Sequence, residues 1–558
     1  MARIDSKVLF ITTSPRTPFR MIPEIDLLNT HFAGRKWNTE TQTAFMQLLR
    51  EENFFNGEGV NDPAFSARDR INRAPKALGF VALSPVIGLT PAGKALIQSK
   101  RKEEIFLRQL LKFQLPSPYH KPTDKAAAFW LKPSLEIFRL IRHFGSLKFD
   151  ELMIFGMQLV DYRLFDHIVS KIEQFRTAKA QTEQNYKSFR NEYLTTELKT
   201  IYSEEITSGI TKTRESNDVS LAKFLQTKAS NMRDYTDALF RYLRATGLVN
   251  ISHVGKSISI APEKLQEVDY FLAHTDREPC FVDDEKAYSH YLANPAIPQL
   301  FTDNKDLLLA KIQSEFSYIK VDRTSSITEL KDILYDEISR RKEAIINEQI
   351  IEIKDYHLYD NIHATFNQIM DKSLYDAPLI LEWNTWRAMT MLDGGQVTAN
   401  LKYDDFGNPM STAQGNVADI VCDYGDFGLT VEVTMQMGQR QYEMEGEPVT
   451  RHLAKLKKET GKPSYCLFIA PQINEACIAH FYALHKMNIS YYGGVSTIVP
   501  LPLNIFQKMI EDSYKAAYTP QPQQIKQFFE RSNEIAAASA DERAWYQGIT
   551  NEALNWLR

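Results

Sequence analysis

Two acids in the C-terminal third of the chain are spaced in a way that suits phosphodiester chemistry. Asp419 is followed thirteen residues later by Glu432, and the turn-forming sequence DYGD at Asp423–Asp426 lies between them. Such a turn predicts a hairpin that returns the second acid beside the first. Two neighbouring carboxylates could bind a divalent metal ion that promotes phosphodiester hydrolysis. Acid pairs joined by a turn are common, so this interpretation needs support from the rest of the chain.

The second acid falls on an expected strand, GLTVEVTM at residues 428–435. Side chains alternate along a strand, so Glu432 and Thr434 point to one face and Val433 to the other. The backbone carbonyl of Val433 can then face the metal. Mg²⁺ takes about six oxygens and keeps several waters, so Asp419, Glu432 and the Val433 carbonyl are a sufficient set of protein ligands.

Length and composition predict a soluble protein of several domains. The 558 residues suffice for three or four domains of ~100–200 residues each. Hydrophobic residues make up 43% and charged residues 24% of the chain, and no apolar run approaches the ~20 residues that span a bilayer. The N-terminal sequence MARIDSKVLFITTSPRTPFR has one short apolar patch and no signal-peptide cleavage pattern. We therefore expect a cytoplasmic protein with no membrane partner.

Cysteine spacing and charge distribution narrow the class further. Cys280, Cys422, Cys466 and Cys477 form no C-x-x-C pair, which predicts reduced structural thiols instead of disulfides or a zinc site. The net charge of −4 conceals an asymmetry, because residues 1–280 contain 40 Lys and Arg against 32 Asp and Glu, and the remainder 26 against 38. A basic first half and an acidic second half suit a polyanion-binding module joined to a metal-binding module.

The basic half begins with a unit near residues 40–120 that is typical of a winged helix-turn-helix. A polar helix is expected at Thr39–Glu51, and AFSARDRINR at Ala64–Arg73 gathers several arginines before Pro75 limits that helix. The following LGFVALSPVIGLTPAGKALI predicts strand, turn, strand and a helix that begins near Thr90. In a winged helix, the arginine-rich helix enters the major groove of DNA. The alternative is a small α+β domain whose arginines are only solvated.

A second unit of similar organisation occurs near residues 228–264. Its helix is followed by two short β-rich runs on either side of the turn HVGK. Two winged-helix-like units in the basic half predict that residues 1–282 form a DNA-recognition region. Double-stranded DNA is therefore the expected partner.

The rest of the chain predicts a connector and a mixed domain. Residues 283–372 are acidic and helical, and Ser326 with Glu329 forms an S-x-x-E capping box that begins a long helix. We interpret this stretch as a helical linker. In residues 373–558 strand-like runs alternate with helices, which predicts an α/β domain.

These segments together resemble the AlwI family of type IIS restriction endonucleases, which includes related site-specific nicking endonucleases. In the C-terminal part the resemblance rests on NVADI, VEVT, MEGEPVTRHL and YCLFIAPQIN. In the N-terminal part it rests on SPR, FSARDR and GLTPAGK. The resemblance implies a FokI-like order of recognition domain, linker and cleavage domain, the last with a PD-(D/E)XK nuclease fold.

The resemblance also implies that Asp419 and Glu432 are the two catalytic acids, with the Val433 carbonyl completing the metal shell. Two positions depart from the general PD-(D/E)XK pattern. Ala418 occupies the position of the proline before the aspartate, and Thr434 occupies the position of the usual lysine. The missing lysine removes a cation that ordinarily orients the water, so another group or a second metal must replace it. Family members carry EVT here too, so the departure does not imply inactivity.

Three further polar residues match the family's active-site region, namely Glu445, His452 and Glu382. His452 could hold or protonate a phosphate oxygen, and Arg451 could clamp one. We expect Pro448 in the first turn of a helix, which leaves Glu445 just ahead of that helix. The alternative for each of the three is a structural role.

The expected DNA contacts lie in the N-terminal segments. Arg16 and Arg20, in a proline-punctuated loop, suit an arm on the phosphates or in a groove. The arginine helix and the segments that match the family supply the other positions. The expected DNA-binding residues are Arg16, Arg20, Ser66, Arg68, Arg70, Arg73, Lys76 and Lys94.

The leading hypothesis is an Mg²⁺-dependent endonuclease that binds a short asymmetric site and cuts outside it. One chain has one such site, so second-strand cleavage needs a transient homodimer or a small catalytic partner subunit. Without either, the chain is a strand-specific nicking endonuclease or the large subunit of a heterodimeric enzyme. A restriction system also implies a bacterial host and a companion DNA methyltransferase. The alternatives are a non-catalytic DNA-binding regulator and a repair or recombination nuclease of the same fold.

Overall fold

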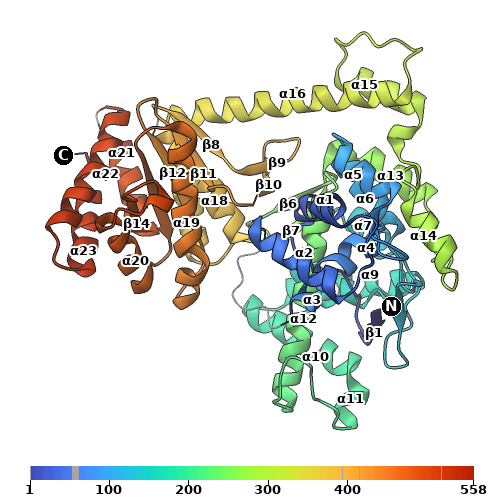
Figure 1. Cartoon of the computed structure of the whole chain (residues 1–558). Coiled ribbons are helices and arrows are strands. Elements are labelled where there is room, and N and C mark those ends of the chain that lie inside the picture. Colours follow the sequence, from blue (N-terminus) through green and yellow to red (C-terminus); the bar gives the residue numbers. More distant parts are fainter. Residues whose placement is uncertain are drawn as a thin grey trace. The chain divides into compact units, whose positions relative to one another are not determined.

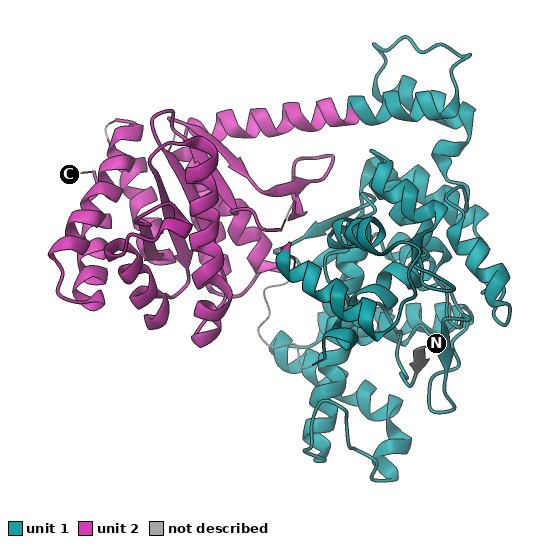
Figure 2. Ribbon diagram, in the orientation of Figure 1, with its two compact units in different colours: residues 1–51, 60–337 teal, residues 52–59, 338–558 magenta. Residues whose placement is uncertain are grey.

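The protein divides into two compact units. The first comprises residues 1–51 and 60–337, and the second comprises residues 52–59 and 338–558. Figure 1 shows the elements of the chain and Figure 2 shows the two units in different colours. The finer division at residues 282 and 372 stays a prediction. The computed structural model describes residues 2–52, 54, 62–392, 394–413, 415–516 and 518–557.

The first unit is mostly helical and contains three small sheets. Its helices are α1 (Met21–Phe32), α2 (Thr39–Glu51), α3 (Pro63–Asn72), α4 (Ala74–Ala77), α5 (Pro91–Gln98), α6 (Lys102–Lys112), α7 (Pro133–Phe144), α8 (Phe149–Ile154), α9 (Phe165–Gln181), α10 (Tyr186–Ile201), α11 (Ser203–Thr207), α12 (Leu221–Arg244), α13 (Leu265–His274), α14 (Glu285–Ala293) and α15 (Lys305–Glu315). Its strands are β1 (Ala2–Ile4), β2 (Val81–Ala82), β3 (Gly88–Leu89), β4 (His120–Pro122), β5 (Ser146–Lys148), β6 (Val249–Ser252) and β7 (Ser257–Ile260). The 3-10 helices are η1 (Pro18–Arg20), η2 (Gly156–Gln158), η3 (Tyr162–Leu164), η4 (Pro262–Lys264) and η5 (Phe301–Asp303).

The first basic unit has the elements that its sequence predicts. Helix α2 has the predicted bounds, and α3 ends at Asn72, before Pro75. Strands β2 and β3 pair antiparallel. The hydroxyl of Thr90 accepts a hydrogen bond from the backbone N–H of Gly93 at 3.0 Å, and Pro91 occupies the first turn of α5. Thr90 therefore caps this helix, as predicted.

The second basic unit is likewise a helix followed by a hairpin. Helix α12 precedes β6 and β7, which pair antiparallel around the predicted turn. Strand β5, far earlier in the sequence, pairs with β7 and completes a three-stranded sheet in the order β5-β7-β6. The sequence did not predict this third strand, because its partner lies about a hundred residues away.

The long helix α16 (Ile327–Lys354) begins with the predicted capping box. The backbone N–H of Ser326 donates to Glu329 Oε2 at 2.7 Å, and that of Glu329 donates to Ser326 Oγ at 3.2 Å. The division between the two units falls inside this helix, after Glu337. No helix of the described residues is long and apolar enough to cross a membrane.

The second unit is built on a mixed sheet of five strands in the order β14-β13-β12-β11-β8. Strands β12, β13 and β14 are parallel, and β11 is antiparallel to both β12 and β8. The strands of this unit are β8 (Gln396–Ala399), β9 (Leu401–Tyr403), β10 (Pro409–Thr412), β11 (Ile420–Asp423), β12 (Gly428–Val433), β13 (Ser464–Ala470) and β14 (Ile498–Pro502). Its helices are α17 (Tyr359–Met370), α18 (Ala377–Met391), α19 (Gln439–Thr460), α20 (Glu475–Lys486), η6 (Ser490–Tyr492), α21 (Leu503–Lys515), α22 (Pro522–Ala538) and α23 (Glu542–Ala553). Helices α19 and α20 connect the parallel strands, as parallel pairing requires.

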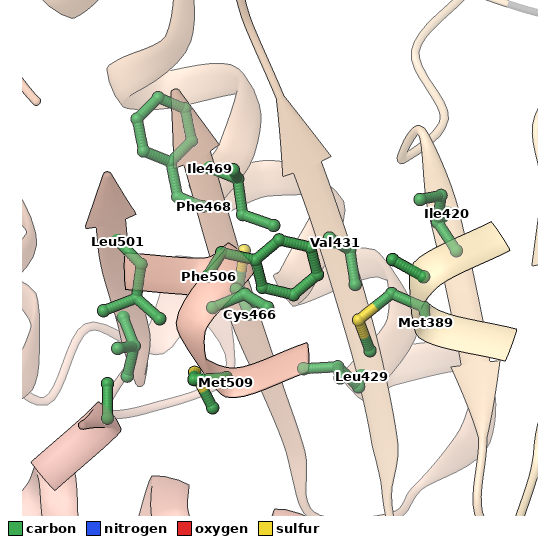
Figure 3. Packing of buried hydrophobic residues seen from close by; sticks show 14 of the residues in the cluster. Met389, Ile420, Leu429, Val431, Cys466, Phe468, Ile469, Leu501, Phe506 and Met509 are labelled. Carbon is green, nitrogen blue, oxygen red and sulfur yellow. The ribbon is translucent and has the colours of Figure 1, made fainter. Parts of the chain in front are cut away.

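The core of the second unit lies where apolar side chains of the sheet meet helices. Figure 3 shows strand residues such as Val431 and Ile469 near Met389 of α18 and Phe506 and Met509 of α21. Cys422, Cys466 and Cys477 are free and buried in this unit, while Cys280 is free and half-buried. The core fixes the strands that carry the acids.

Candidate active site

The acid pair lies on the hairpin that the sequence predicts. Strands β11 and β12 pair antiparallel with Ile420 opposite Val431, so Asp419 lies across from Glu432. The tight turn between the strands uses Gly425 at φ +82°, a conformation that favours glycine. The Asp423 side chain accepts a hydrogen bond from the Gly425 N–H at 2.9 Å and stabilises that turn. The hairpin therefore brings together two acids that are thirteen residues apart.

Backbone donors fix both carboxylates. Asp419 Oδ2 accepts a hydrogen bond from the N–H of Val433 at 2.9 Å. The backbone N–H of Asp419 in turn donates to the Glu432 side chain. Glu432 is only 5% exposed, so its carboxyl is held inside the protein. The two acids are thus oriented by the same stretch of the hairpin.

Helix α19 supplies two more of the predicted residues, and its start differs from the prediction. The helix runs from Gln439 to Thr460 with Pro448 inside it, so Glu445 lies on the helix and not ahead of it. Proline lacks an N–H and leaves the carbonyl four residues earlier without its helical donor. That residue is Met444, which is exposed, so water can take the donor's place. Glu445 and His452 are two turns apart and share one face of the helix.

His452 contacts the acid pair directly. Its Nδ1 lies 2.7 Å from Glu432 Oε1, and its buried Nε2 has no hydrogen-bond partner among the described residues. Burial, reinforced by the charge of Arg451, lowers the pKa of His452 to about 4. The ring is therefore neutral at pH 7, which favours an accepting role for Nε2 over protonation of a phosphate oxygen. Arg451 itself pairs with Glu447 at 3.2 Å.

The last predicted catalytic residue, Glu382, reaches the same region from α18. Its charge raises the pKa of Glu432, so the two carboxylates are close. Glu382 Oε2 accepts a hydrogen bond from the hydroxyl of Thr412 on β10 at 3.2 Å. The sequence did not identify Thr412, since it carries no motif and lies thirty residues from its partner. Glu382, Asp419, Glu432 and Glu445 form what we call the acid cluster.

The acid cluster is an unfavourable place for negative charge. Burial, together with the charges of Glu432 and Glu445, raises the pKa of Asp419 well above its ordinary value. Burial and the charges of Glu445 and Glu382 do the same for Glu432. Burial also raises the pKa of Glu445, although a hydrogen bond with the Thr434 side chain opposes the shift. Perturbed carboxylates of this kind are typical of functional sites.

The donor set fits a cation that takes few protein ligands. Among the described residues, no group of three or more His, Cys, Asp and Glu side chains could hold a metal ion. Mg²⁺ commonly binds through one or two carboxylates and fills its other positions with water and phosphate oxygens. Asp419 and Glu432 suit that mode, because a cation beside them would offset the repulsion that raises both pKa values.

The expected DNA-binding residues of the first unit differ in how free their side chains are. Arg70 donates to Glu24, whose side chain is 3% exposed, so this arginine also neutralises a buried acid. Arg73 pairs with Asp69 at 2.5 Å. Arg68 donates to the Gln42 side chain at 2.8 Å and is 39% exposed. Arg68 thus retains more contact with solvent than Arg70.

The remaining expected DNA-binding residues are Arg16, Arg20, Ser66, Lys76 and Lys94. Arg20 and Lys94 are exposed and Ser66 is half-buried. Arg16 is exposed and forms a 3.2 Å pair with Asp234. Lys76 lies over the ring of Tyr119, and burial lowers its pKa despite the opposing charge of Glu285. Within this group, Arg16, Arg20 and Lys94 are the most accessible to a phosphate.

Three comparisons with known proteins were made. A family model described as AlwI restriction endonuclease matches residues 76–509. The small subunit of the heterodimeric restriction endonuclease BspD6I is similar at 24% identity over 36% of this chain and 95% of that chain, with a TM-score of 0.29. The restriction endonuclease FokI is similar at 11% identity over 84% of this chain and 82% of that chain, with a TM-score of 0.21. A comparison with curated protein sequences gave no match.

Proposed function

Because this chain belongs to the AlwI restriction endonuclease family, we propose that it is a type IIS DNA endonuclease. It binds a short asymmetric site in duplex DNA and hydrolyses phosphodiester bonds outside that site, with Mg²⁺ as cofactor. The observation that carries this proposal is the acid cluster, in which Asp419 and Glu432 lie side by side, are oriented by hydrogen bonds, and have their pKa values raised by burial and neighbouring carboxylates. The second unit is the cleavage module with a PD-(D/E)XK fold, and the first unit, with its two winged-helix-like units, contains the recognition module.

The two acids would hold the metal ion. Mg²⁺, when bound, would stabilise charge on the scissile phosphate and lower the pKa of a bound water. Asp419 is held by the Val433 N–H and Glu432 by His452 and the Asp419 N–H, so neither carboxylate must reorganise to bind a cation. The Val433 carbonyl is the third protein ligand in this proposal. The remaining positions belong to water and DNA.

His452 takes over part of the role of the absent lysine. A neutral ring that donates from Nδ1 to Glu432 leaves Nε2 as an acceptor, and that atom has no partner in the described structure. We assign Nε2 the task of accepting a hydrogen bond from the attacking water. Glu445 lies on the same helix face and holds a proton more readily than an exposed acid, so it suits a proton-transfer role next to the acids. Glu382 completes the negative charge that attracts the cation.

The number of strands cut depends on partners. A chain with one acid pair of this kind cuts one strand at a time. Cleavage of both strands then requires a second cleavage module, from a transient homodimer or from a small partner subunit. If neither binds, the product is a nick. A methyltransferase that protects the host site completes the proposed system.

Supercoiled plasmid of known sequence tests this proposal directly. With Mg²⁺ the protein should convert it to open-circular or linear DNA, and EDTA should prevent conversion. Sequencing of the ends should place every cut at a fixed distance from one short sequence, which a structure-directed repair nuclease does not produce. If the protein demonstrably binds the plasmid but the DNA stays supercoiled, the result would falsify the nuclease hypothesis. It would support the hypothesis of a non-catalytic DNA-binding regulator.

A pair of variants on the hairpin assigns the chemistry to the acids. Asp419→Ala should abolish conversion of the plasmid and leave binding to the recognition sequence intact. Asp426→Ala is the matched control, because Asp426 lies in the same hairpin and is exposed. The control should retain activity. Equal activity of the Asp419 variant and wild type would remove the acid pair from the mechanism.

A further inference from the structure

A group of four charged side chains, two of them buried and two half-buried, lies where the long helix α16 begins. We call it the ion cluster, and its members are Glu104 and Arg108 of α6, Asp303 of η5 and Lys331 of α16. Lys331 and Arg108 are buried, with side chains 6% and 4% exposed. Two cations and two anions make the cluster neutral. None of these residues belongs to the acid cluster.

Every member of the ion cluster contacts both residues of opposite charge. Lys331 Nζ lies 2.6 Å from a Glu104 oxygen and 2.6 Å from an Asp303 oxygen. Arg108 donates to Glu104 at 2.6 Å and to both oxygens of Asp303 at 2.8 Å. Arg108 also donates to the backbone carbonyls of Ala296 and Pro298. Lys331 therefore joins a network that already ties α6 to the segment before η5.

Two outer pairs extend this contact along the same side of α16. Arg101, just before α6, pairs with Asp332 of α16 and also approaches Glu104 at 3.5 Å. Lys100 approaches Asp336 at 3.4 Å, but both side chains are largely exposed. The first part of α16 is thus attached to the first unit through charge, and the strength of the contact decreases from Lys331 toward Asp336.

The last part of α16 is held in the second unit by apolar contacts. Ile353 is 1% exposed in that unit's hydrophobic core, and Ile346 and Ile350 pack against it. Gly407 lies so close that a Cβ added there would come within 3.1 Å of Ile345 Cγ2. The 28 residues of α16 therefore contribute their first part to the first unit and their last part to the second.

A helix attached in this way converts a small change at one end into a larger one at the other. At ~1.5 Å per residue the helix is about 42 Å long. A tilt of about 5° at its start moves its end by about 3.7 Å, which is close to the rise of ~3.4 Å per nucleotide step in DNA.

We infer that the ion cluster determines the cut position, with Lys331 as the positioning residue that fixes the linker helix on the recognition unit. This inference rests on the proposed function, since it concerns the distance between the recognition sequence and the scissile bond. Weakening the cluster should spread the cuts over neighbouring phosphodiester bonds without changing the sequence that is recognised. Its residues touch neither DNA bases nor the acid cluster in this assignment.

The test compares Lys331→Met with wild type on one plasmid of known sequence and maps every cut end by sequencing. Wild type should cut at one fixed distance from its recognition sequence. Lys331→Met should cut at the same recognition sequences but over at least two adjacent bonds. Lys331→Arg keeps the charge and should restore the narrow distribution. Lys100→Ala, in the exposed outer pair, is the control and should cut as wild type does.

The outcomes separate this inference from the proposed function. If wild type cuts no plasmid, the proposed function fails and the inference fails with it. If wild type cuts and a folded Lys331→Met cuts at the same single bond, the inference is wrong and the proposed function stands. If Lys331→Met does not fold, Asp332→Ala decides, because Asp332 is partly exposed and its pair with Arg101 borders the cluster. An unchanged cut position in the Asp332 variant overturns the inference.

Discussion

The ion cluster of the first unit and the acid cluster of the second contain similar numbers of buried charged groups but balance them differently. In the ion cluster, burial raises the pKa of Glu104, yet the charges of Lys331 and Arg108 more than offset burial and hold that pKa below its ordinary value. In the acid cluster, burial and neighbouring carboxylates raise the pKa of both Asp419 and Glu432. The first group is complete within the protein. The second has no cation among its members, and the charge of the neighbouring Arg451 offsets only part of the shift at Glu432.

This difference separates a structural group from a functional one. A buried charge is costly unless it is paired and hydrogen-bonded, so a fold that serves only stability leaves few such charges unpaired. The ion cluster follows that rule. The acid cluster gathers carboxylates around β11 and β12, two interior strands of the sheet, which is expected where a ligand supplies positive charge. The predictions below test this contrast.

The largest effect should come from Glu432→Gln. Glutamine keeps the shape and can still accept from His452, but it removes a metal-binding charge. The cleavage rate should fall at least ~10⁴-fold, about 5 kcal/mol of transition-state stabilisation. In EDTA the second unit should be as stable as wild type or more so, because a repelling buried charge has gone. Plasmid cleavage measures the rate, and denaturant unfolding measures the stability of the second unit. A loss of stability together with the loss of cleavage would contradict the proposed difference between the acid cluster and the ion cluster.

Lys331→Met should have the opposite profile. Removing one cation leaves Glu104 and Asp303 with Arg108 alone, and breaking a buried charge network costs ~3–5 kcal/mol. The first unit should therefore unfold at a lower denaturant concentration, while DNA hydrolysis per bound complex changes little. Tryptophan fluorescence and circular dichroism in urea follow this unfolding. A stability equal to that of wild type would mean that the ion cluster contributes nothing.

Metal binding should stabilise only the second unit. Mg²⁺ at about one hundred times its Kd should add about 2.7 kcal/mol to its stability, and EDTA should remove that gain. Thermal unfolding with and without Mg²⁺ gives the shift. Asp419→Ala should abolish the shift, and Asp426→Ala, at an exposed position of the same hairpin, should retain it. A shift that survives in the Asp419 variant would place the metal elsewhere.

Changes of pH should affect the two clusters in opposite directions. The lowered pKa of Glu104 and of Asp303 means that the unfolded chain binds more protons, so the first unit loses stability as pH falls below about 4.5. The raised pKa of Asp419 and of Glu432 means that the folded chain binds more protons. The metal-free second unit should then lose stability as pH rises above about 4.5, by ~1.4 kcal/mol per unit of pKa difference.

His452 opposes part of this trend in the second unit. Its pKa of about 4 lies below the ordinary 6.5, so between these values it contributes a gain in stability as pH rises. His452 should therefore offset part of the decline due to the carboxylates between pH 4 and 6.5, and Mg²⁺ should reduce that decline. Urea unfolding in EDTA from pH 4 to 8 measures both units. A second unit that becomes more stable above pH 6.5 would contradict the assigned repulsion.

The smallest effect should come from Lys100→Ala. The pair with Asp336 is 3.4 Å long and both side chains are largely exposed, and such surface pairs contribute ~0–1 kcal/mol. We expect a change of about 0.5 kcal/mol or less, which salt should remove. Unfolding at low and high NaCl measures it. A loss comparable to that of Lys331→Met would mean that exposed charge, and not burial, holds α16.

The sequence by itself determined the features that depend on neighbouring residues. The bounds of α2, the Thr90 cap and the Ser326–Glu329 capping box were all predicted, because each is decided within one or two helical turns. The hairpin between Asp419 and Glu432 belongs with them, since a glycine turn and alternating side chains fix its register. The family resemblance added Glu445, His452 and Glu382, whose catalytic roles stay predictions.

Only the tertiary structure decided which distant groups meet. Lys331 lies 227 residues from Glu104, and no local pattern indicates that pairing. Helix α19 continues through Pro448, because packing against β12 and β13 and an exposed carbonyl outweigh the local preference for a helix start. The same packing places His452 on Glu432. Charge balance is likewise a property of the folded chain, because a residue's type states its charge but its neighbours decide whether that charge is neutralised.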